Sequence, residues 1–196
     1  MSTNYNIDEK QALFLAGQPA VDFLNTEWPN ADGKKDFFNT DDDVFLWLRQ
    51  AKLAIEGVFE VRPMGSLLRA AHALRDTIRY LVEERKAGKQ PDLSDLNAFL
   101  AAAQRHRRLT WTKAKTVTEE LIRSHDTAEQ ILAPLAEKAA DLLVHVDFRR
   151  IRRCADPICM HWFYDTTKSG RRRWCSMATC GNKVKVKAYR MRKNVD

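Results

Sequence analysis

The sequence lacks the features that mark membrane and secreted proteins. No apolar run in its 196 residues approaches the roughly 18 residues that a membrane-spanning helix needs. The first ten residues contain Asp8 and Glu9 and lack the apolar core of a signal peptide. No internal repeat or low-complexity tract is present. We therefore expect a cytoplasmic protein with no membrane partner.

Motifs of the common enzyme classes are also missing. The chain has no glycine-rich phosphate loop, no HExxH or GxSxG sequence, and no pair of metal-binding histidines at helical spacing. These absences argue against a catalytic site. We expect that the protein is not an enzyme.

Cysteine does not occur before position 154, and four cysteines then follow as Cys154, Cys159, Cys175 and Cys180. Their spacing, C-x4-C-x15-C-x4-C, allows two short loops to present two thiols each to one ion. Thiolates prefer Zn²⁺ in a closed tetrahedral site, which is structural because no position remains for water. Reducing conditions in the cytoplasm favour zinc over the alternatives, disulfides and free thiols. We predict one structural Zn²⁺ at these four residues.

The net charge of +7 is unevenly distributed. Residues 149–196 hold 14 Lys/Arg and 3 Asp/Glu, a balance of +11, whereas residues 1–148 hold 19 and 23, a balance of −4. Such asymmetry is expected of a protein with a nucleic-acid contact in one module. The predicted organisation is an N-terminal domain over residues 1–148 and a basic metal module over residues 149–196.

The N-terminal domain has mainly helical periodicity. Apolar residues recur at three- and four-residue steps over Ser66–Lys86 and, less strongly, over Asp92–His106. Thr40, followed by three aspartates, predicts the start of another helix. Asp126 with Glu129 resembles a capping box that opens a further helix. The predicted fold class is therefore mainly α, with a multihelical N-terminal domain.

Three shorter patterns in this domain predict interruptions. Alternation over residues 107–118 indicates a small β-hairpin, and the polar stretch Pro29–Phe38 indicates a surface loop. Pro134 lies inside the last helical pattern, where it should cause a kink or a late start.

The metal module has the pattern of a treble-clef-like zinc finger. A short strand over residues 149–155 leads to the first ligand, and Trp162, Phe163 and Tyr164 form a return strand. The second cysteine pair stands at the start of a helix from about Ala178 to Lys193. So small a module depends on its metal for folding. We expect Trp162, Phe163 and Trp174 to form its core, and His161 to lie at the surface or beside the ligands.

Basic residues flank the second cysteine pair. An arginine run precedes it and a helix with lysines and arginines follows it, so both could contact one phosphate backbone without reading sequence. The predicted nucleic-acid contacts are Arg171, Arg172, Arg173, Lys183, Lys185, Lys187, Arg190 and Arg192. The alternative for these residues is a solvated basic helix that only aids solubility.

A polar cluster interrupts an apolar stretch near the N-terminus. Asp22, Asn25 and Thr26 could line a pocket for a small-molecule effector. Capping and turn hydrogen bonds are the other role open to them.

Two segments of the chain resemble known families. The run Trp174-Cys175-Ser176-Met177-Ala178-Thr179-Cys180-Gly181-Asn182-Lys183 resembles the signature of the CGNR zinc finger, as does the upstream order Cys154, Cys159, Phe163, Asp165, Thr166, Thr167. The run Gly17-Gln18-Pro19-Ala20-Val21-Asp22-Phe23-Leu24-Asn25-Thr26 is similar to the opening of the ABATE domain, which commonly precedes this finger. Together the two resemblances cover essentially the whole chain.

The resemblance implies a function. Proteins of this type are regarded as bacterial stress-linked transcription regulators, with zinc at the four cysteines and DNA contact from the finger. The N-terminal domain would then sense an effector or form a homodimer. Lys183 departs from the motif, whose last residue is Arg, and lysine keeps the charge but loses the planar fork for bidentate contacts. The alternative function is a zinc-stabilised module that binds protein or RNA without sequence-specific DNA binding.

Overall fold

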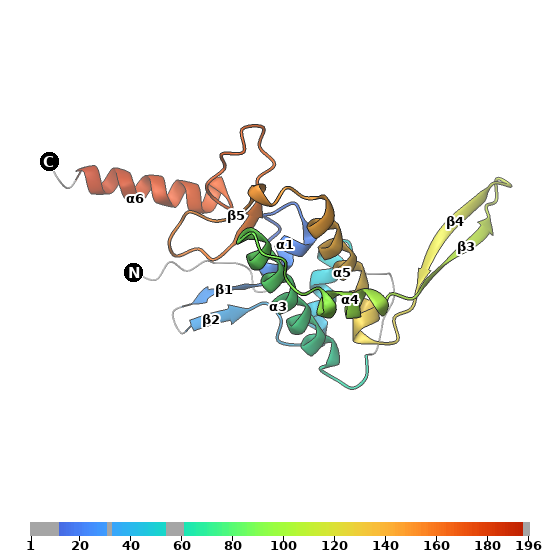
Figure 1. The fold of residues 1–196 in the computed structure, drawn as a ribbon. Coiled ribbons are helices and arrows are strands. Elements are labelled where there is room, and N and C mark those ends of the chain that lie inside the picture. The colour runs from blue at the N-terminus through green and yellow to red at the C-terminus, as the bar shows by residue number, and fades with distance from the viewer. Residues whose placement is uncertain (1–11, 31–32, 54–60, 194–196) are drawn as a thin grey trace.

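The computed structural model describes residues 12–30, 33–53 and 61–193. Within these residues, helices form the body, and of the three antiparallel two-stranded sheets two extend from the body while the third packs against it (Figure 1). The element order is α1 (Pro19–Leu24), β1 (Glu27–Asn30), β2 (Gly33–Asp36), α2 (Asp41–Gln50), α3 (Ser66–Lys86), α4 (Ser94–Ala101), β3 (Arg105–Trp111), β4 (Val117–Arg123), α5 (Ala128–His145), β5 (Ile151–Arg153), β6 (Trp162–Tyr164) and α6 (Asn182–Lys193). The mainly α fold class predicted from the sequence is confirmed. None of the helices in these ranges is long and apolar enough to cross a membrane.

The core lies between α1, α2, α3 and α5. The apolar stripe of α3 is fully enclosed, with Leu67, Leu74 and Ile78 at most 1% exposed. An aromatic cluster completes the core beside it, where the ring of Phe23 lies 5.0 Å from that of Trp47 and 5.3 Å from that of Phe38. Helix α3 has the predicted bounds because one apolar face continues along its whole length.

Helices α2 and α5 each begin with a side-chain cap, and one of these caps differs from its prediction. Thr40 and Asp43 form a capping box at the start of α2, as the sequence indicates. At α5 the cap is Thr127 and not Asp126, because the Thr127 hydroxyl accepts from the Gln130 amide at 3.3 Å. Pro134 lies inside α5, and the helix continues through it to His145.

One of the two hairpins described here was predicted from the sequence, and the other was not. Strands β3 and β4 form the predicted hairpin, which is longer than expected and pairs Arg105 with Arg123 at its base and Trp111 with Val117 near its tip. Since β3 begins at Arg105, α4 ends earlier than the predicted His106. The prediction of a loop over Pro29–Phe38 was wrong in part, because β1 pairs with β2. These strands are polar and short, so they leave no alternating pattern in the sequence.

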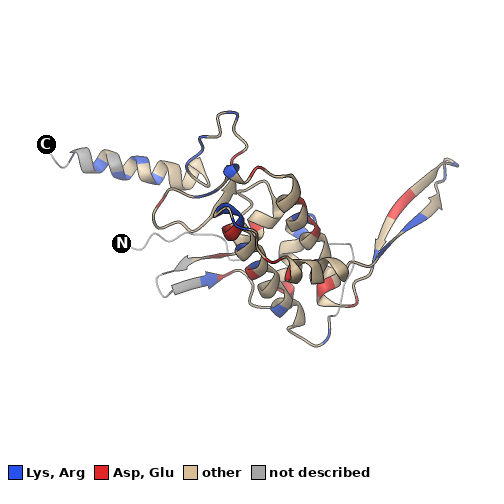
Figure 2. Cartoon of the chain, in the orientation of Figure 1, with Lys and Arg blue, Asp and Glu red and all other residues tan. Residues whose placement is uncertain are grey.

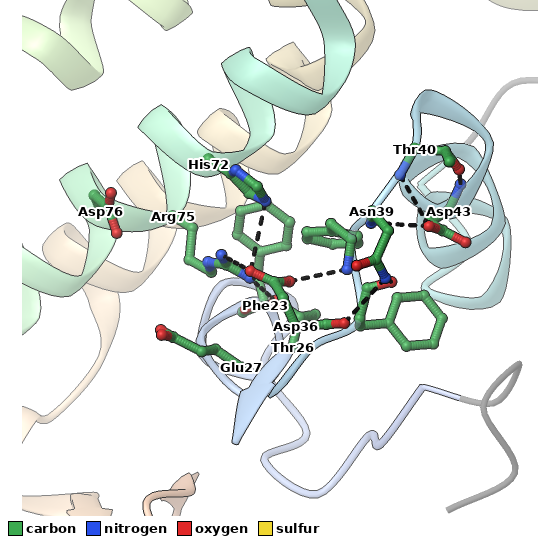
Figure 3. A network of polar contacts seen from close by, with 12 residues as sticks. Phe23, Thr26, Glu27, Asp36, Asn39, Thr40, Asp43, His72, Arg75 and Asp76 are labelled. Carbon is green, nitrogen blue, oxygen red and sulfur yellow. Dashed lines mark hydrogen bonds and ion pairs between the residues drawn. The ribbon is translucent and has the colours of Figure 1, made fainter. Parts of the chain in front are cut away.

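The β1–β2 hairpin is bound to α3 by ion pairs (Figure 3). Arg75 is 5% exposed, and its Nη1 donates to Asp36 Oδ1 at 2.8 Å and to Thr26 Oγ1 at 2.9 Å. A second bond from Nη2 to Asp36 Oδ2 makes the pair bidentate. Arg79, one turn later on α3, pairs with Glu27 at 2.8 Å. Bidentate pairing of this kind fixes orientation as well as distance.

The C-terminal module is joined to the body through Asn25, directly after α1. The side-chain amide of Asn25 donates to the carbonyl of Trp162 at 2.9 Å, and its Oδ1 accepts from the Trp162 amide at 2.8 Å. Asn25 therefore pairs with β6 as a neighbouring strand would, and it is only 3% exposed. Contrary to our expectation of a shared aromatic core in the finger, Trp162 packs into the core of the N-terminal body.

This clamp gives a testable prediction. Asn25→Ala leaves the buried amide and carbonyl of Trp162 without partners, which costs about 1–3 kcal/mol in the free energy of unfolding. Urea unfolding of the zinc-loaded protein would measure it. The control is Asn97→Ala on the exposed side of α4, which should stay within about 0.5 kcal/mol of the parent. Equal values for the two variants would show that the clamp does not contribute.

Candidate metal centre

Four sulfur atoms converge between two turns of the C-terminal module. Cys154 follows β5 directly and Cys159 lies in the loop before β6, whereas Cys175 and Cys180 precede α6. All four sulfurs lie within 4.8 Å of one another, and Cys175 Sγ is 3.7 Å from both Cys159 Sγ and Cys180 Sγ. Zn–S bonds of about 2.3 Å in a tetrahedron require sulfurs about 3.8 Å apart. The four residues therefore fit one zinc ion.

Backbone hydrogen bonds hold the two turns in place. The Cys154 amide donates to the His161 carbonyl at 2.9 Å, and the Cys159 amide donates to the Asp156 carbonyl at 2.9 Å. The second pair is positioned by the π-helical turn η2 (Met177–Gly181). The side-chain oxygen of Ser176 caps this turn by accepting a hydrogen bond from the backbone amide of Thr179 at 3.3 Å. Each pair of sulfurs is thus positioned by a turn that closes on itself.

The crowded sulfurs perturb one another's proton affinity. A hydrogen bond from the Cys175 thiol lowers the pKa of Cys159, while that same bond, burial and the neighbouring cysteine charges raise the pKa of Cys175. Four buried thiolates repel one another unless a cation lies among them. Zinc supplies that charge and releases the protons when it binds.

His161 lies beside the sulfurs and is not needed as a fifth ligand. It is 5% exposed, and its Nδ1 is 3.8 Å from Cys175 Sγ. Of the two positions that the sequence left open for His161, the surface and the side of the ligands, the structure shows the second.

Asp165 and Arg172 form an internal support beneath the cysteines. Asp165 is fully buried and accepts from the Arg172 amide at 2.8 Å and from the Thr167 hydroxyl at 2.6 Å. Burial alone would raise the pKa of Asp165, but these hydrogen bonds and the charge of Arg152 lower it below its ordinary value. The Arg172 guanidinium lies 4.6 Å over the Phe163 ring and donates to the Trp174 carbonyl at 2.9 Å.

The predicted phosphate contacts therefore differ in their surroundings. Arg172 is engaged inside the module, whereas Arg171 and Arg173 are exposed on either side of it. Lys183 is half-buried, and its Nζ lies 3.6 Å from Asp156 Oδ2. Exposed cations on α6 are Lys185, Lys187, Arg190 and Lys193, and Arg192 belongs to the same helix although its side chain lies outside the described part. Figure 2 shows blue cationic positions repeated along α6, which extends away from the body.

The three polar residues predicted for an effector site have internal partners. Asp22 Oδ1 accepts from the amides of Leu15 and Ala16 at 2.7 and 2.8 Å. Asn25 holds Trp162, and the Thr26 hydroxyl donates to the Phe23 carbonyl at 2.7 Å. All three are 3% exposed. Asp22 and Thr26 thus make local turn hydrogen bonds, one of the two roles that the sequence left open, whereas Asn25 makes a long-range contact with β6.

A helical domain with an attached four-cysteine centre defines a two-module zinc-finger protein. The ABATE family model, described as "Putative stress-induced transcription regulator", matches residues 17–146, and the CGNR zinc finger model matches residues 150–193. The chain belongs to the ABATE family and ends in a CGNR zinc finger, as its sequence resemblance implies. No curated protein matches the chain.

The neighbour role of His161 gives a second prediction. His161→Ala should still hold one zinc per chain, but with about 10–100-fold weaker affinity because Cys175 loses a supporting contact. Competition with a chromogenic chelator measures the affinity, and elemental analysis measures the stoichiometry. His106→Ala, at an exposed position of β3, serves as the control and should match the parent. Complete loss of zinc in His161→Ala would instead make His161 a ligand.

Asp22 gives a third prediction, on pH dependence. Burial raises the pKa of Asp22 from 3.8 to about 6, despite the amides that donate to it. The folded protein therefore keeps a proton that the unfolded chain releases, so this contribution to stability is present below pH 4 and is lost as the pH rises to 6. Asp22→Asn lacks this titration. The parent should lose about 2 kcal/mol relative to it between pH 4 and pH 7, measured by urea unfolding, and parallel profiles would contradict this account.

Proposed function

We propose that this protein is a transcription regulator that binds duplex DNA through its zinc finger. The observation that carries the proposal is the set of exposed cations on both sides of the sulfur cluster, Arg171 and Arg173 before it and the α6 residues after it. The membership of the ABATE family supports the same role.

The surface before the cluster has a shape suited to a phosphate group. A shallow hollow of about 420 Å³ is lined by Arg171, Arg173, Thr167, Ser169 and Trp174, among others. Guanidinium groups and hydroxyls are the usual partners of phosphate oxygens. Arg173 also lies 5.2 Å over the Trp174 ring, which limits its motion. Since the Arg172 guanidinium donates to carbonyl groups of the module, we assign the phosphate contacts here to Arg171 and Arg173.

Helix α6 suits the major groove. Its 12 residues span about 18 Å at 1.5 Å per residue, and B-DNA admits one α-helix in a groove about 12 Å wide. Figure 1 shows that α6 extends away from the body, so its sides are open to a ligand. Lys185, Lys187 and Arg190 would then contact phosphates along the groove.

The N-terminal domain would hold the finger and provide dimer contacts. Asp22, Asn25 and Thr26 are hydrogen-bonded within the protein, so the proposed function gives this cluster no role in binding an effector. An RNA- or protein-binding module is the competing function, and competition experiments separate the two.

The fourth prediction tests DNA binding by its salt dependence. The logarithm of the affinity for a fluorescent duplex should fall linearly with the logarithm of the salt concentration, with a slope near −0.9 per phosphate contacted. Lys185→Gln and Lys187→Gln should each reduce the steepness by about 1. Fluorescence anisotropy with the zinc-loaded full chain would measure this.

Arg69→Gln is the matched control, because Arg69 is exposed on α3 within the body. It removes the same charge and should leave the slope unchanged. Lack of duplex binding at low salt would refute the proposal. Preferential competition by structured RNA would favour the alternative.

A further inference from the structure

The β3–β4 hairpin projects from the body on the side opposite α6 (Figure 1). Every residue of β3 and the first five of β4 are exposed. Its base is fixed by ion pairs of Arg105 and Arg123 with Glu137 of α5 at 2.8 and 2.7 Å. At about 3.4 Å per residue, the seven-residue strands reach about 24 Å from that base.

One face of this hairpin carries its exposed apolar side chains, together with the ion pair of Arg107 and Glu119 at 3.5 Å. Cross-strand partners share a face, and the register pairs Trp111 with Val117, Leu109 with Glu119 and Arg107 with Leu121. All four of the exposed large hydrophobic side chains of the hairpin thus lie on one side: Leu109 (66% exposed), Trp111 (75%), Val117 (51%) and Leu121 (47%). The other face carries Thr110, Thr118 and the pair Arg108–Glu120.

An isolated two-stranded hairpin is marginally stable in water, and a contiguous exposed apolar face indicates an interaction site. Trp111 is the strongest single indicator, because exposed tryptophans are enriched among the residues that dominate binding energy. The hairpin therefore has a surface suited to being covered by a partner.

Charge selects the partner. Residues 105–123 hold 6 Lys/Arg and 2 Asp/Glu, a balance of +4, whereas the rest of the N-terminal domain (residues 1–104 and 124–148) holds 13 and 21, a balance of −8. Two hairpins packed on each other would repel, and the finger, at +11, would repel a hairpin more strongly. Glu119 lies on this same face, 3.5 Å from Arg107, and its carboxylate is still unfavourable next to nucleic-acid phosphates. The acidic helical body of a second copy is the complementary surface.

A suitable hollow lies between α3 and α4. It has a volume of about 450 Å³ and is lined by Ala73, Asp76, Thr77, Tyr80, Asp95 and Phe99, with Ala98. Its walls thus combine aromatic and small apolar side chains with two carboxylates. Trp111 suits the apolar part of this hollow, and Lys113 and Lys115, in the turn beyond it, suit the carboxylates.

We propose that the β3–β4 hairpin of each chain docks into the α3–α4 hollow of a second copy, with Trp111 as the anchor. Reciprocal exchange of the two hairpins closes a two-fold dimer in which each chain gives and receives the same contact. The apolar faces of both hairpins are covered in this arrangement, and the two fingers stay free of the interface.

The test is the oligomeric state of the zinc-loaded full chain without DNA, measured by sedimentation over a wide concentration range. The parent should form a dimer. Trp111→Ser should raise the dissociation constant about 30-fold or more, since removing such an anchor costs about 2 kcal/mol and 1.4 kcal/mol is a factor of ten. Thr110→Ser, on the opposite face, is the matched control and should not change the constant.

Swapping the charges of one lysine and one aspartate identifies the acceptor hollow. Because the double variant should regain affinity, this test separates loss of the contact from misfolding of a single variant. Asp95→Lys and Lys113→Glu should each weaken the dimer, and combining them should restore part of the affinity. Glu129→Lys, at an exposed position of α5, is the control for the acidic site.

A parent that stays monomeric at all concentrations would overturn the proposal, as would a dimer unaffected by Trp111→Ser. A dimer sensitive to Trp111→Ser but not to Asp95→Lys would overturn the assignment of the hollow. An unchanged oligomeric state with weakened DNA binding in Trp111→Ser would mean that nucleic acid covers the hairpin. Because dimerisation is measured without DNA, its failure is separate from a failure of the proposed function.

Discussion

The convergence of four cysteine sulfurs is the constraint on which the rest of the C-terminal module depends. Buried thiolates 3.7 Å apart repel one another, so this arrangement is stable only with a cation among them. The π-helical turn that presents Cys180 also sets the direction in which α6 leaves the module. The metal centre therefore determines where the exposed cations of α6 lie, although no cation of that helix is a ligand.

The module is also fixed to the helical body, which makes the two halves one mechanical unit. Asn25 pairs with the backbone of Trp162, and Lys86 Nζ donates to the Ile151 carbonyl at 2.6 Å. Arg172 extends from the module to the Leu15 carbonyl at 3.3 Å. Polar contacts at several points and the burial of Trp162 leave little freedom for the finger to rotate on a hinge. Any movement of α1 would thus be transmitted directly to β6.

Sequence reasoning succeeded where a local pattern determines the structure. The apolar stripe of α3, the cap at Thr40 and the cysteine spacing each carry their own signal, and each is found in the structure. It failed where partners are distant in the chain. The polar strands β1 and β2 are held by Arg75 and Arg79 of α3, and Trp162 packs with the N-terminal core, so no short window of sequence could reveal them. Burial of Asp22 and Asn25 was equally invisible, because it depends on segments that meet only after folding.

The arginine run before Cys175 has consequences for reading natural variation at these positions. Its middle member stacks on Phe163 and donates to backbone carbonyls, while its neighbours are open to solvent. Lysine would preserve charge at Arg171 and Arg173, but at Arg172 it would lose the planar group that both stacks and donates in several directions. The three adjacent arginines are therefore under different structural constraints, Arg171 and Arg173 for charge and Arg172 for shape.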